Sequence, residues 1–161
     1  MTRPLRGIRV VDFSWVGAGS YATKILADLG ADVIKIESTK KIDGIRLSPP
    51  FSGGRSGVNR SGYFADRNTS KRSMLLNLKE PGGVDIALEL IARADIVCNN
   101  FSPGVMERLG LGYDEVARVN PRVVYLSMSM NGGTGPERHA RGYGAMMSAI
   151  TGFHHLCGLP G

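Results

Sequence analysis

Cysteine is scarce in this sequence, with two among 161 residues, Cys98 and Cys157. Neither belongs to a Cys-x-x-Cys pair, and a chain of this length buries enough apolar surface to fold without cross-links. The sequence therefore gives no sign of a disulfide framework or of a zinc site, and we expect no metal. Buried or idle thiols are the expected state of the two cysteines.

Long apolar runs are also missing. No stretch approaches the roughly 20 apolar residues that a membrane span requires, and the N-terminal MTRPLRGIR lacks the apolar part of a secretion signal. We therefore expect a cytoplasmic protein without a membrane partner. With 42% hydrophobic and 21% charged residues, the composition is that of an ordinary globular domain.

Aromatic residues make up only 7% of the chain, and they are sparse in its most basic segment. Residues 35–72 hold nine Lys or Arg against three acids, whereas the rest of the chain has eleven of each sign, so the whole excess of +6 lies there. Phe51, Tyr63 and Phe64 are the only aromatic residues of this segment, and the chain has no RNA- or DNA-binding motif. We therefore expect a phosphorylated small molecule, and no nucleic acid, as the partner of the segment.

Short apolar runs alternate with helical patterns along the chain. Strands are predicted at 8–13, 31–37, 73–78, 94–100 and 123–129, and helices at 20–29, 80–93, before 109, at 113–119 and at 143–153. This alternation predicts an α/β fold with a Rossmann-like, mainly parallel sheet and helices on both faces. We expect a single domain over residues 1–161, with a long basic loop over about residues 38–70 of the kind that is usually functional or disordered.

A glycine-rich turn follows the first predicted strand. Gly17, Gly19 and Ala22 fit the G-x-G-x-x-G/A fingerprint of dinucleotide-binding domains, and Glu37 ends the second strand, where such domains hold an acid against the ribose. One interpretation is therefore an NAD(P)-dependent oxidoreductase domain. The fit is imperfect, because three residues separate the strand from Gly17 and because lysines follow Glu37. A tight turn that binds no ligand is the other interpretation.

Four ordered stretches resemble the N-terminal part of the family III CoA-transferases, which include formyl-CoA transferase, the carnitine CoA-transferases and the α-methylacyl-CoA racemases. These stretches are residues 7–13 (GIRVVDF), 27–37 (ADLGADVIKIE), 68–73 (NTSKRS) and 99–105 (NNFSPGV). The resemblance extends from residue 4 to about residue 153. It implies a larger fold in which two chains interlock as a dimer. This sequence would be its CoA-binding portion, without the second domain and the C-terminal half.

The resemblance also implies a site for coenzyme A, bound as the acyl-CoA substrate. Because CoA has a 3'-phosphate and a pyrophosphate, a basic segment beside the turn suits it better than it suits NAD. Val16, Gly17 and Ala18 resemble the loop that lies against the pantetheine or thioester arm. The remaining implied contacts are at the end of the fourth strand, in the basic pair before the third strand and at two further arginines: Asn100, Phe101, Lys71, Arg72, Arg108 and Arg141.

The chemistry of the family implies a nucleophile that this sequence does not supply. Transferase members use an aspartate that attacks the acyl-CoA thioester, forms an acyl anhydride and releases CoA thiolate. The resemblance places that aspartate beyond Pro160–Gly161. Tyr143, near the acyl site, stands where racemase members have a histidine base, and a tyrosine with a pKa of about 10 is a poor base at neutral pH. The transferase branch is therefore favoured over a racemase.

The implied substrates are an acyl-CoA and a carboxylate. Because a Met-rich last helix would leave apolar surface exposed, we expect a homodimer, or a heteromer with a chain that supplies the C-terminal half. A non-catalytic subunit of a split enzyme is the alternative. His154 and His155 stand beside Cys157, but adjacent side chains on a helix point to different faces, so a thiol-imidazole pair is not expected.

Overall fold

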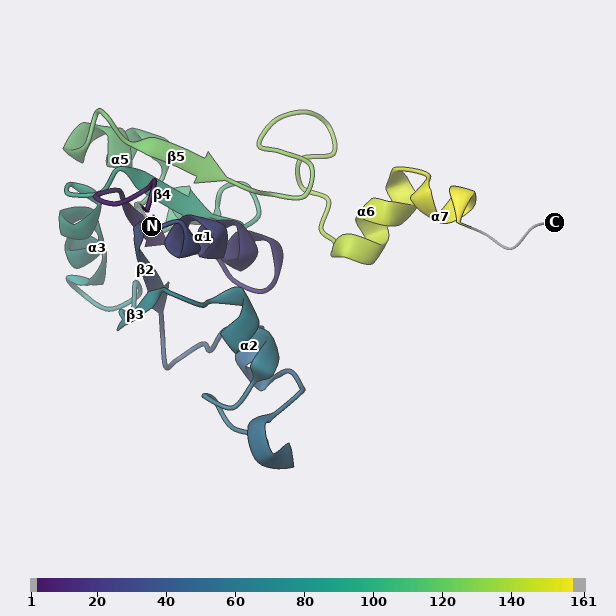
Figure 1. Cartoon of the computed structure of the whole chain (residues 1–161). Helices are drawn as coiled ribbons and strands as arrows, with labels where there is room; N and C mark the ends of the chain where they lie inside the picture. Colours follow the sequence, from purple (N-terminus) through teal and green to yellow (C-terminus); the bar gives the residue numbers. More distant parts are fainter. Residues whose placement is uncertain (1–2, 158–161) are drawn as a thin grey trace.

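The computed structural model describes residues 3–157 and is built around a sheet of five parallel strands (Figure 1). The strands lie in the order β3-β2-β1-β4-β5 and span Arg9–Asp12 (β1), Asp32–Glu37 (β2), Arg72–Leu75 (β3), Ile96–Asn99 (β4) and Val124–Ser127 (β5). This order is that of a Rossmann-type sheet. The α/β prediction is therefore confirmed, although each strand is one to three residues shorter than predicted.

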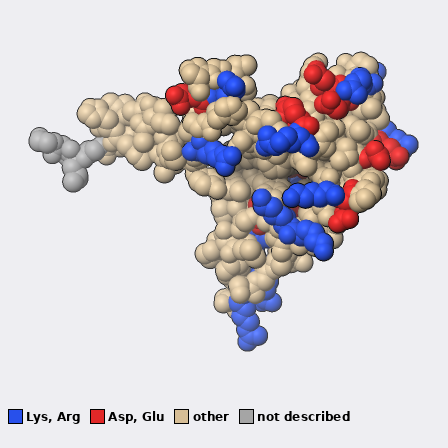
Figure 2. Space-filling view, turned by 180° about the vertical axis from the view of Figure 1, so that it is seen from behind, with Lys and Arg blue, Asp and Glu red and all other residues tan. Residues whose placement is uncertain are grey.

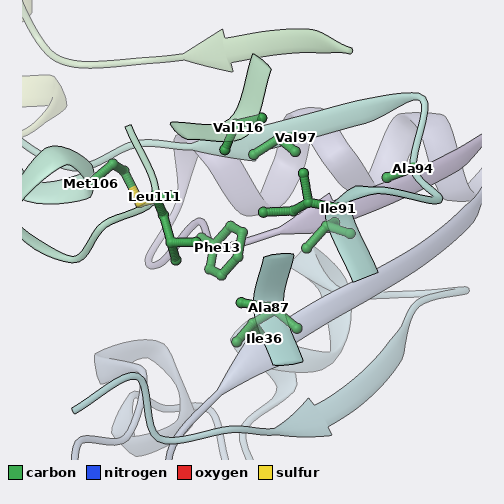
Figure 3. Close-up of a cluster of buried hydrophobic side chains, with 10 residues drawn as sticks. Phe13, Ile36, Ala87, Ile91, Ala94, Val97, Met106, Leu111 and Val116 are labelled. Atoms are coloured by element: carbon green, nitrogen blue, oxygen red, sulfur yellow. The ribbon is translucent and has the colours of Figure 1, made fainter. Parts of the chain in front are cut away.

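Helices cover both faces of the sheet. Neighbouring residues of a strand point to opposite sides, and here the side chains on both sides are apolar and pack against helices. Val10 packs with Ala27 of α1 (Ala18–Asp28), whereas Val11 faces a second cluster on the other side. That second cluster is formed with α3 (Gly83–Ile91), α4 (Val105–Arg108) and α5 (Tyr113–Val119). Figure 3 shows its side chains converging around Phe13 and Ile91. In open α/β sheets, ligands bind outside the carboxyl ends of the strands.

The segment between β2 and β3 has more structure than a loop prediction implies. It contains two short 3-10 helices and one α-helix, η1 (Gly44–Leu47), η2 (Ser52–Gly54) and α2 (Gly62–Arg67). Asp43 caps η1 and Ser61 caps α2, each by accepting a hydrogen bond from a backbone N–H. Composition concealed these elements because Ser, Asp and Gly are typical both of loops and of helix caps.

The chain after β5 forms α6 (Gly144–Ile150) and α7 (Phe153–Leu156), which contact each other and extend away from the sheet (Figure 1). A single helix was predicted here, but Gly152 adopts a left-handed φ of 77° and divides it in two. Pro160 and Gly161, beyond which the nucleophilic aspartate is expected, lie outside the described residues. Among residues 3–157, no helix has the length and apolar character needed to cross a membrane.

Candidate functional site

The turn that joins β1 to α1, residues 14–17, is held by side chains from three other parts of the chain. The Ser14 N–H donates to Asp12 Oδ1 at 2.9 Å, the Trp15 N–H to Asn100 Oδ1 at 2.8 Å, and the Val16 N–H to Asp43 Oδ1 at 3.1 Å. Val16 has a φ of 59°, and for a β-branched residue this left-handed conformation costs about 1–3 kcal/mol. The surrounding hydrogen bonds therefore stabilise a strained turn.

Asn100 binds the turn at two points. In addition to accepting from the Trp15 N–H, its Nδ2 donates to the Trp15 carbonyl oxygen at 2.7 Å. The next residue, Phe101, packs edge-on against the Trp15 ring, with the ring centroids 5.9 Å apart. The structure thus brings the predicted residues Asn100 and Phe101 together with the turn, at the carboxyl ends of β4 and β1. They contact its backbone and its tryptophan.

Four charged side chains lie buried beneath this turn, and we call them the buried charge network: Asp12, Lys35, Asp43 and Lys71. Lys35 Nζ donates to the Ser14 carbonyl oxygen at 2.6 Å and to Ser20 Oγ at 3.3 Å. It also lies 3.2 Å from Asp43 Oδ2, which is an ionic contact and not a well-directed hydrogen bond. Because buried charges are costly unless paired, each cation has an acid beside it.

Lys71, predicted to contact CoA, points into this network. Its Nζ donates to Asp12 Oδ2 at 3.0 Å, to the Ser20 carbonyl oxygen at 2.8 Å and to Asn68 Oδ1 at 2.9 Å. The side chain is 2% exposed, and burial lowers the pKa of Lys71 although Asp12 opposes that shift. Three protein acceptors match the three protons of an ammonium group. Lys71 is therefore placed to support the turn from below.

Glu37, the acid of the dinucleotide interpretation, is fully engaged by protein groups. Arg46 Nε donates to its Oε1 and Arg46 NH2 to its Oε2, both at 2.8 Å, while Ser73 Oγ donates to Oε2 at 2.7 Å. Burial alone would raise the pKa of Glu37, but the hydrogen bonds and the charge of Arg46 hold it below its ordinary value. With 6% of the side chain exposed, this carboxylate is not presented to a ribose.

The predicted arginines lie in different places. Arg72 begins β3 and pairs with Asp32 at the start of β2, so its guanidinium lies at the amino edge of the sheet, opposite the turn. Arg108 ends α4 and is exposed. Among the residues that the structure describes, the Arg108 guanidinium has no hydrogen-bond or ion-pair partner. The Arg108 guanidinium is thus available to bind an anionic ligand, whereas the Arg72 guanidinium is already paired with Asp32.

The glycines of the fingerprint mainly serve internal packing. A Cβ on Gly19 would lie 2.4 Å from the Ser14 Cβ and 2.9 Å from the Asn100 Cγ, and a Cβ on Gly17 would lie 3.2 Å from the Tyr63 hydroxyl oxygen. At the start of α1, however, the N–H groups of Gly17 and Ala18 have no acceptor within residues 3–157, and the first turn contains no acid. These free donors, at the positive end of an 11-residue helix, suit a negatively charged or carbonyl group.

Arg141, implied as a CoA contact, and Tyr143, implied near the acyl site, stand apart from the turn. Arg141 and Tyr143 lie just before α6, on the part of the chain that extends from the sheet (Figure 1), and the Tyr143 side chain is 77% exposed. None of the hydrogen bonds or ion pairs among the described residues joins them to the turn. The structure therefore places them at a second location.

The two cysteines differ in environment. Cys98 is fully buried, and burial raises the pKa of its thiol to about 12, so it is not a nucleophile at neutral pH. Cys157 is exposed and follows α7. Within the described part of the chain, no group of three or more His, Cys, Asp or Glu residues is arranged to hold a metal ion.

Cations lie beside the turn and along the neighbouring segment. Figure 2, a view from behind, shows Lys and Arg side chains on the middle of the main body and on the arm below it, where η1, η2 and α2 lie. Lys41 Nζ lies 5.3 Å from the centre of the Trp15 ring, and the Arg67 guanidinium lies 4.7 Å from the centre of the Tyr21 ring. An anionic ligand at the turn would therefore meet cations on its approach.

Sequence reasoning missed three residues that shape the site, Asp12, Lys35 and Asp43. A signal existed for the first two. Strands in a parallel sheet covered on both faces are expected to be apolar throughout, so the Asp of IRVVDF and the Lys of DVIKIE each mark an inward-facing charge that needs a partner. Asp43 had no comparable signal, because it lies in the segment predicted as a loop.

Comparison with known proteins identifies the family. A family model described as CoA-transferase family III matches residues 5–161. The chain is 41% identical over 158 residues to succinyl-CoA:glutarate CoA-transferase of Mus musculus, covering 97% of this chain and 35% of that protein. It is 37% identical over 160 residues to the beta subunit of succinyl-CoA–L-malate CoA-transferase of Chloroflexus aurantiacus, covering 99% of this chain and 38% of that protein.

A solved structure has a similar fold. The crystal structure of a hypothetical protein from Mycobacterium tuberculosis matches 98% of this chain with a TM-score of 0.83 and 34% identity. That match covers 42% of the solved chain, and the present chain spans little more than a third of the length of the two relatives above. Sequence, fold and family model agree over nearly all of its residues, and the chain therefore belongs to CoA-transferase family III.

Proposed function

We propose that this chain forms the CoA-binding part of an acyl-CoA transferase that exchanges CoA between carboxylic acids. The observation that carries the proposal is the turn itself: Val16, Gly17 and Ala18 lie at the carboxyl edge of the sheet, and cations lie on the approach. The N–H groups of Gly17 and Ala18 have no acceptor among the residues that the structure describes. These donors suit the carbonyl and phosphate oxygens of an acyl-CoA. Both relatives named above are CoA-transferases.

In this proposal the residues have different roles. Val16, Gly17 and Ala18 contact the thioester arm, while Asn100, Phe101 and Lys71 hold the turn from behind. Arg108, which is exposed and without an ion-pair partner in the described chain, binds a phosphate of the nucleotide. Arg72 supports the fold at the amino edge of the sheet. Arg141 and Tyr143 approach the acyl group only in the assembled enzyme.

In this proposal the covalent step uses a carboxylate that residues 1–161 do not supply. Its oxygen attacks the thioester carbonyl carbon, a C–O bond forms, the C–S bond breaks, and sulfur leaves as CoA thiolate, which gives an acyl anhydride. The negative charge on the carbonyl oxygen during this step needs hydrogen-bond donors. The contribution of the present chain is to bind CoA and to fix the position of the thioester.

Assembly with a second chain follows from the same proposal. Tyr143, Met146, Ile150, Phe153 and Leu156 are between 50% and 81% exposed on α6, α7 and the residue before α6, an unusual density of uncovered apolar side chains. The relatives in Chloroflexus aurantiacus include an alpha and a beta subunit. We therefore propose a homodimer or a heteromer. Native mass measurement distinguishes these assemblies from a monomeric, non-catalytic chain.

Calorimetric titration tests the binding proposal. The chain is titrated separately with CoA and with NAD under identical buffer and salt conditions. We expect a saturable signal with CoA and none with NAD, because Glu37 is occupied by Arg46 and Ser73. Binding of NAD without any response to CoA would instead support the oxidoreductase interpretation.

A further inference from the structure

Asp43 links the basic segment to the turn of the proposed CoA site. It lies six residues after β2, and its side chain is 1% exposed. Its Oδ1 accepts hydrogen bonds from the Val16 N–H at 3.1 Å and from the Ile45 N–H at 3.2 Å, while its Oδ2 lies beside Lys35 Nζ. One carboxylate thus joins the turn after β1, the start of η1 and the buried cation of β2.

The hydrogen bond to Val16 falls on the most strained residue of the turn. Val16 is one of two non-glycine residues with positive φ in the described chain, and it alone of the two is β-branched. The free N–H groups of Gly17 and Ala18 follow it directly. If Val16 relaxed to an ordinary extended conformation, the direction of these two N–H groups would change, because each φ and ψ sets the orientation of the next peptide.

The negative charge of Asp43, considered without its hydrogen bonds, should weaken the binding of an anionic ligand. Asp43 is one of three acids in the basic segment, so removing its charge makes the site more positive and should favour an anionic ligand by long-range attraction. Asp66, another of the three, lies in the same segment and is 60% exposed, and within residues 3–157 it pairs only with its neighbour Arg67. Asp66 is therefore a matched control for the charge change, without contact to the turn.

We propose that Asp43 is a positioning residue for CoA binding: by holding the Val16 N–H it keeps Gly17 and Ala18 directed at the ligand, so that folding of the segment after β2 and ligand binding are coupled. This inference rests on the proposed function, because CoA is the ligand concerned. Asp43 does not itself contact the ligand; it acts through Val16.

The experiment compares the wild-type chain with Asp43→Ala, Asp43→Asn and Asp66→Ala. Calorimetry measures the affinity for CoA, and hydrogen exchange followed by NMR measures the protection of the Val16 amide, with Val10 and Val11 of β1 as internal references. We expect D43A to bind CoA about tenfold more weakly, which corresponds to about 1.4 kcal/mol. It should lose protection at the two amides that Asp43 binds, Val16 and Ile45, and keep it at Val10 and Val11. D66A should bind CoA as well as the wild type or more tightly.

The Asn variant separates positioning from charge. D43N retains an oxygen that can accept from the Val16 N–H, so we expect it to keep Val16 protected and to bind CoA more tightly than D43A. This variant also decides the question if D43A does not fold: a D43N chain with a protected Val16 amide but tenfold weaker CoA binding would overturn the proposal. If Asp43 acted only through its charge, D43A and D43N would bind CoA with equal affinity, at least as tightly as the wild type.

The two proposals fail in distinguishable ways. If the wild-type chain does not bind CoA, the proposed function fails for this chain, and no role in CoA binding remains for Asp43. If the wild type binds CoA but D43A binds it as tightly as D66A does, only the positioning role of Asp43 is overturned. Unchanged protection of the Val16 amide in a folded D43A chain would also overturn it.

Discussion

The carboxylate of Glu37 and the guanidinium of Arg46 form a paired contact with two hydrogen bonds of 2.8 Å, at the point where β2 enters the basic segment. Arg46 also donates through NH1 to the Val58 carbonyl oxygen and to Asn59 Oδ1, and its guanidinium lies 3.5 Å from the centre of the Phe64 ring. This pair ties the segment after β2 to the sheet. It also explains why an acid at the end of β2 need not indicate NAD.

Replacing Glu37 by Gln tests the structural role of this pair. Only 6% of the Glu37 side chain and 12% of the Arg46 side chain are exposed, and removing one charge from a buried pair costs about 3–5 kcal/mol. We therefore expect E37Q to lower the free energy of unfolding by about 3 kcal/mol, measured by urea denaturation. The control is Asp66→Asn, which breaks the exposed Asp66–Arg67 pair and should cost at most about 1 kcal/mol. Equal losses in the two variants would contradict this assignment.

Lowering the pH should reduce the free energy of unfolding, because it protonates the Glu37 carboxylate. The folded-state pKa of Glu37 lies below the ordinary value of 4.5, because the hydrogen bonds and charge of Arg46 outweigh the effect of burial. The stabilisation is therefore present above pH 4.5 and is lost as the pH falls through the folded-state pKa. Measured between about pH 7 and about pH 3, the free energy of unfolding should fall less steeply in E37Q than in the wild type. Parallel curves would show that Glu37 does not contribute.

Asn100→Ala should make the turn after β1 less ordered, because Asn100 holds Trp15 by two hydrogen bonds. The variant leaves the Trp15 N–H and the Trp15 carbonyl oxygen without their side-chain partner. We expect CoA affinity to fall about tenfold. A displaced turn would lose about one hydrogen bond to the ligand, which has a free energy of that size. Trp15 is the only tryptophan of the chain, so its fluorescence reports the turn directly. An unchanged emission spectrum together with unchanged affinity would show that Asn100 is not needed to hold Trp15.

Replacement of Arg108 by Ala should change the affinity for CoA more than replacement of Arg72 by Ala, although both remove one positive charge. Arg108 is exposed without an ion-pair partner among residues 3–157, whereas Arg72 pairs with Asp32 at the opposite edge of the sheet. We expect R108A to weaken CoA binding about tenfold and to reduce its dependence on salt, because a contact with a phosphate is lost. R72A should change affinity by less than about twofold. The reverse order would place the nucleotide at the amino edge.

The sheet was predictable because its strands are marked by apolar, β-branched runs that alternate with helical spacing. The all-parallel pairing and the placement of helices on both faces follow from that alternation. The short elements after β2 were not predictable, since η1 depends on a cap by Asp43 whose other partners, Val16 and Lys35, are distant in sequence. Periodicity contains no information about such contacts.

The sequence allowed us to predict that several candidate residues lie together, but not how the side chains beneath them pair. Val16, Gly17, Ala18, Asn100 and Phe101 do meet at one edge of the sheet, as parallel strands require. The resemblance implied that Lys71 contacts CoA, but its side chain points inward and pairs with Asp12. Whether a cation faces solvent or a buried acid depends on tertiary packing, which a single sequence does not specify.

The most direct test of the account is to map CoA binding residue by residue. Two-dimensional ¹⁵N NMR of the 17.3 kDa chain, titrated with CoA, reports each backbone amide separately. We predict the largest shifts at Gly17 and Ala18, with smaller ones at Trp15 and Arg108 and none at Arg9 or Arg72. Shifts confined to the amino edge of the sheet, or no shift at Gly17 and Ala18 at saturating CoA, would contradict the claim that this turn binds the thioester arm.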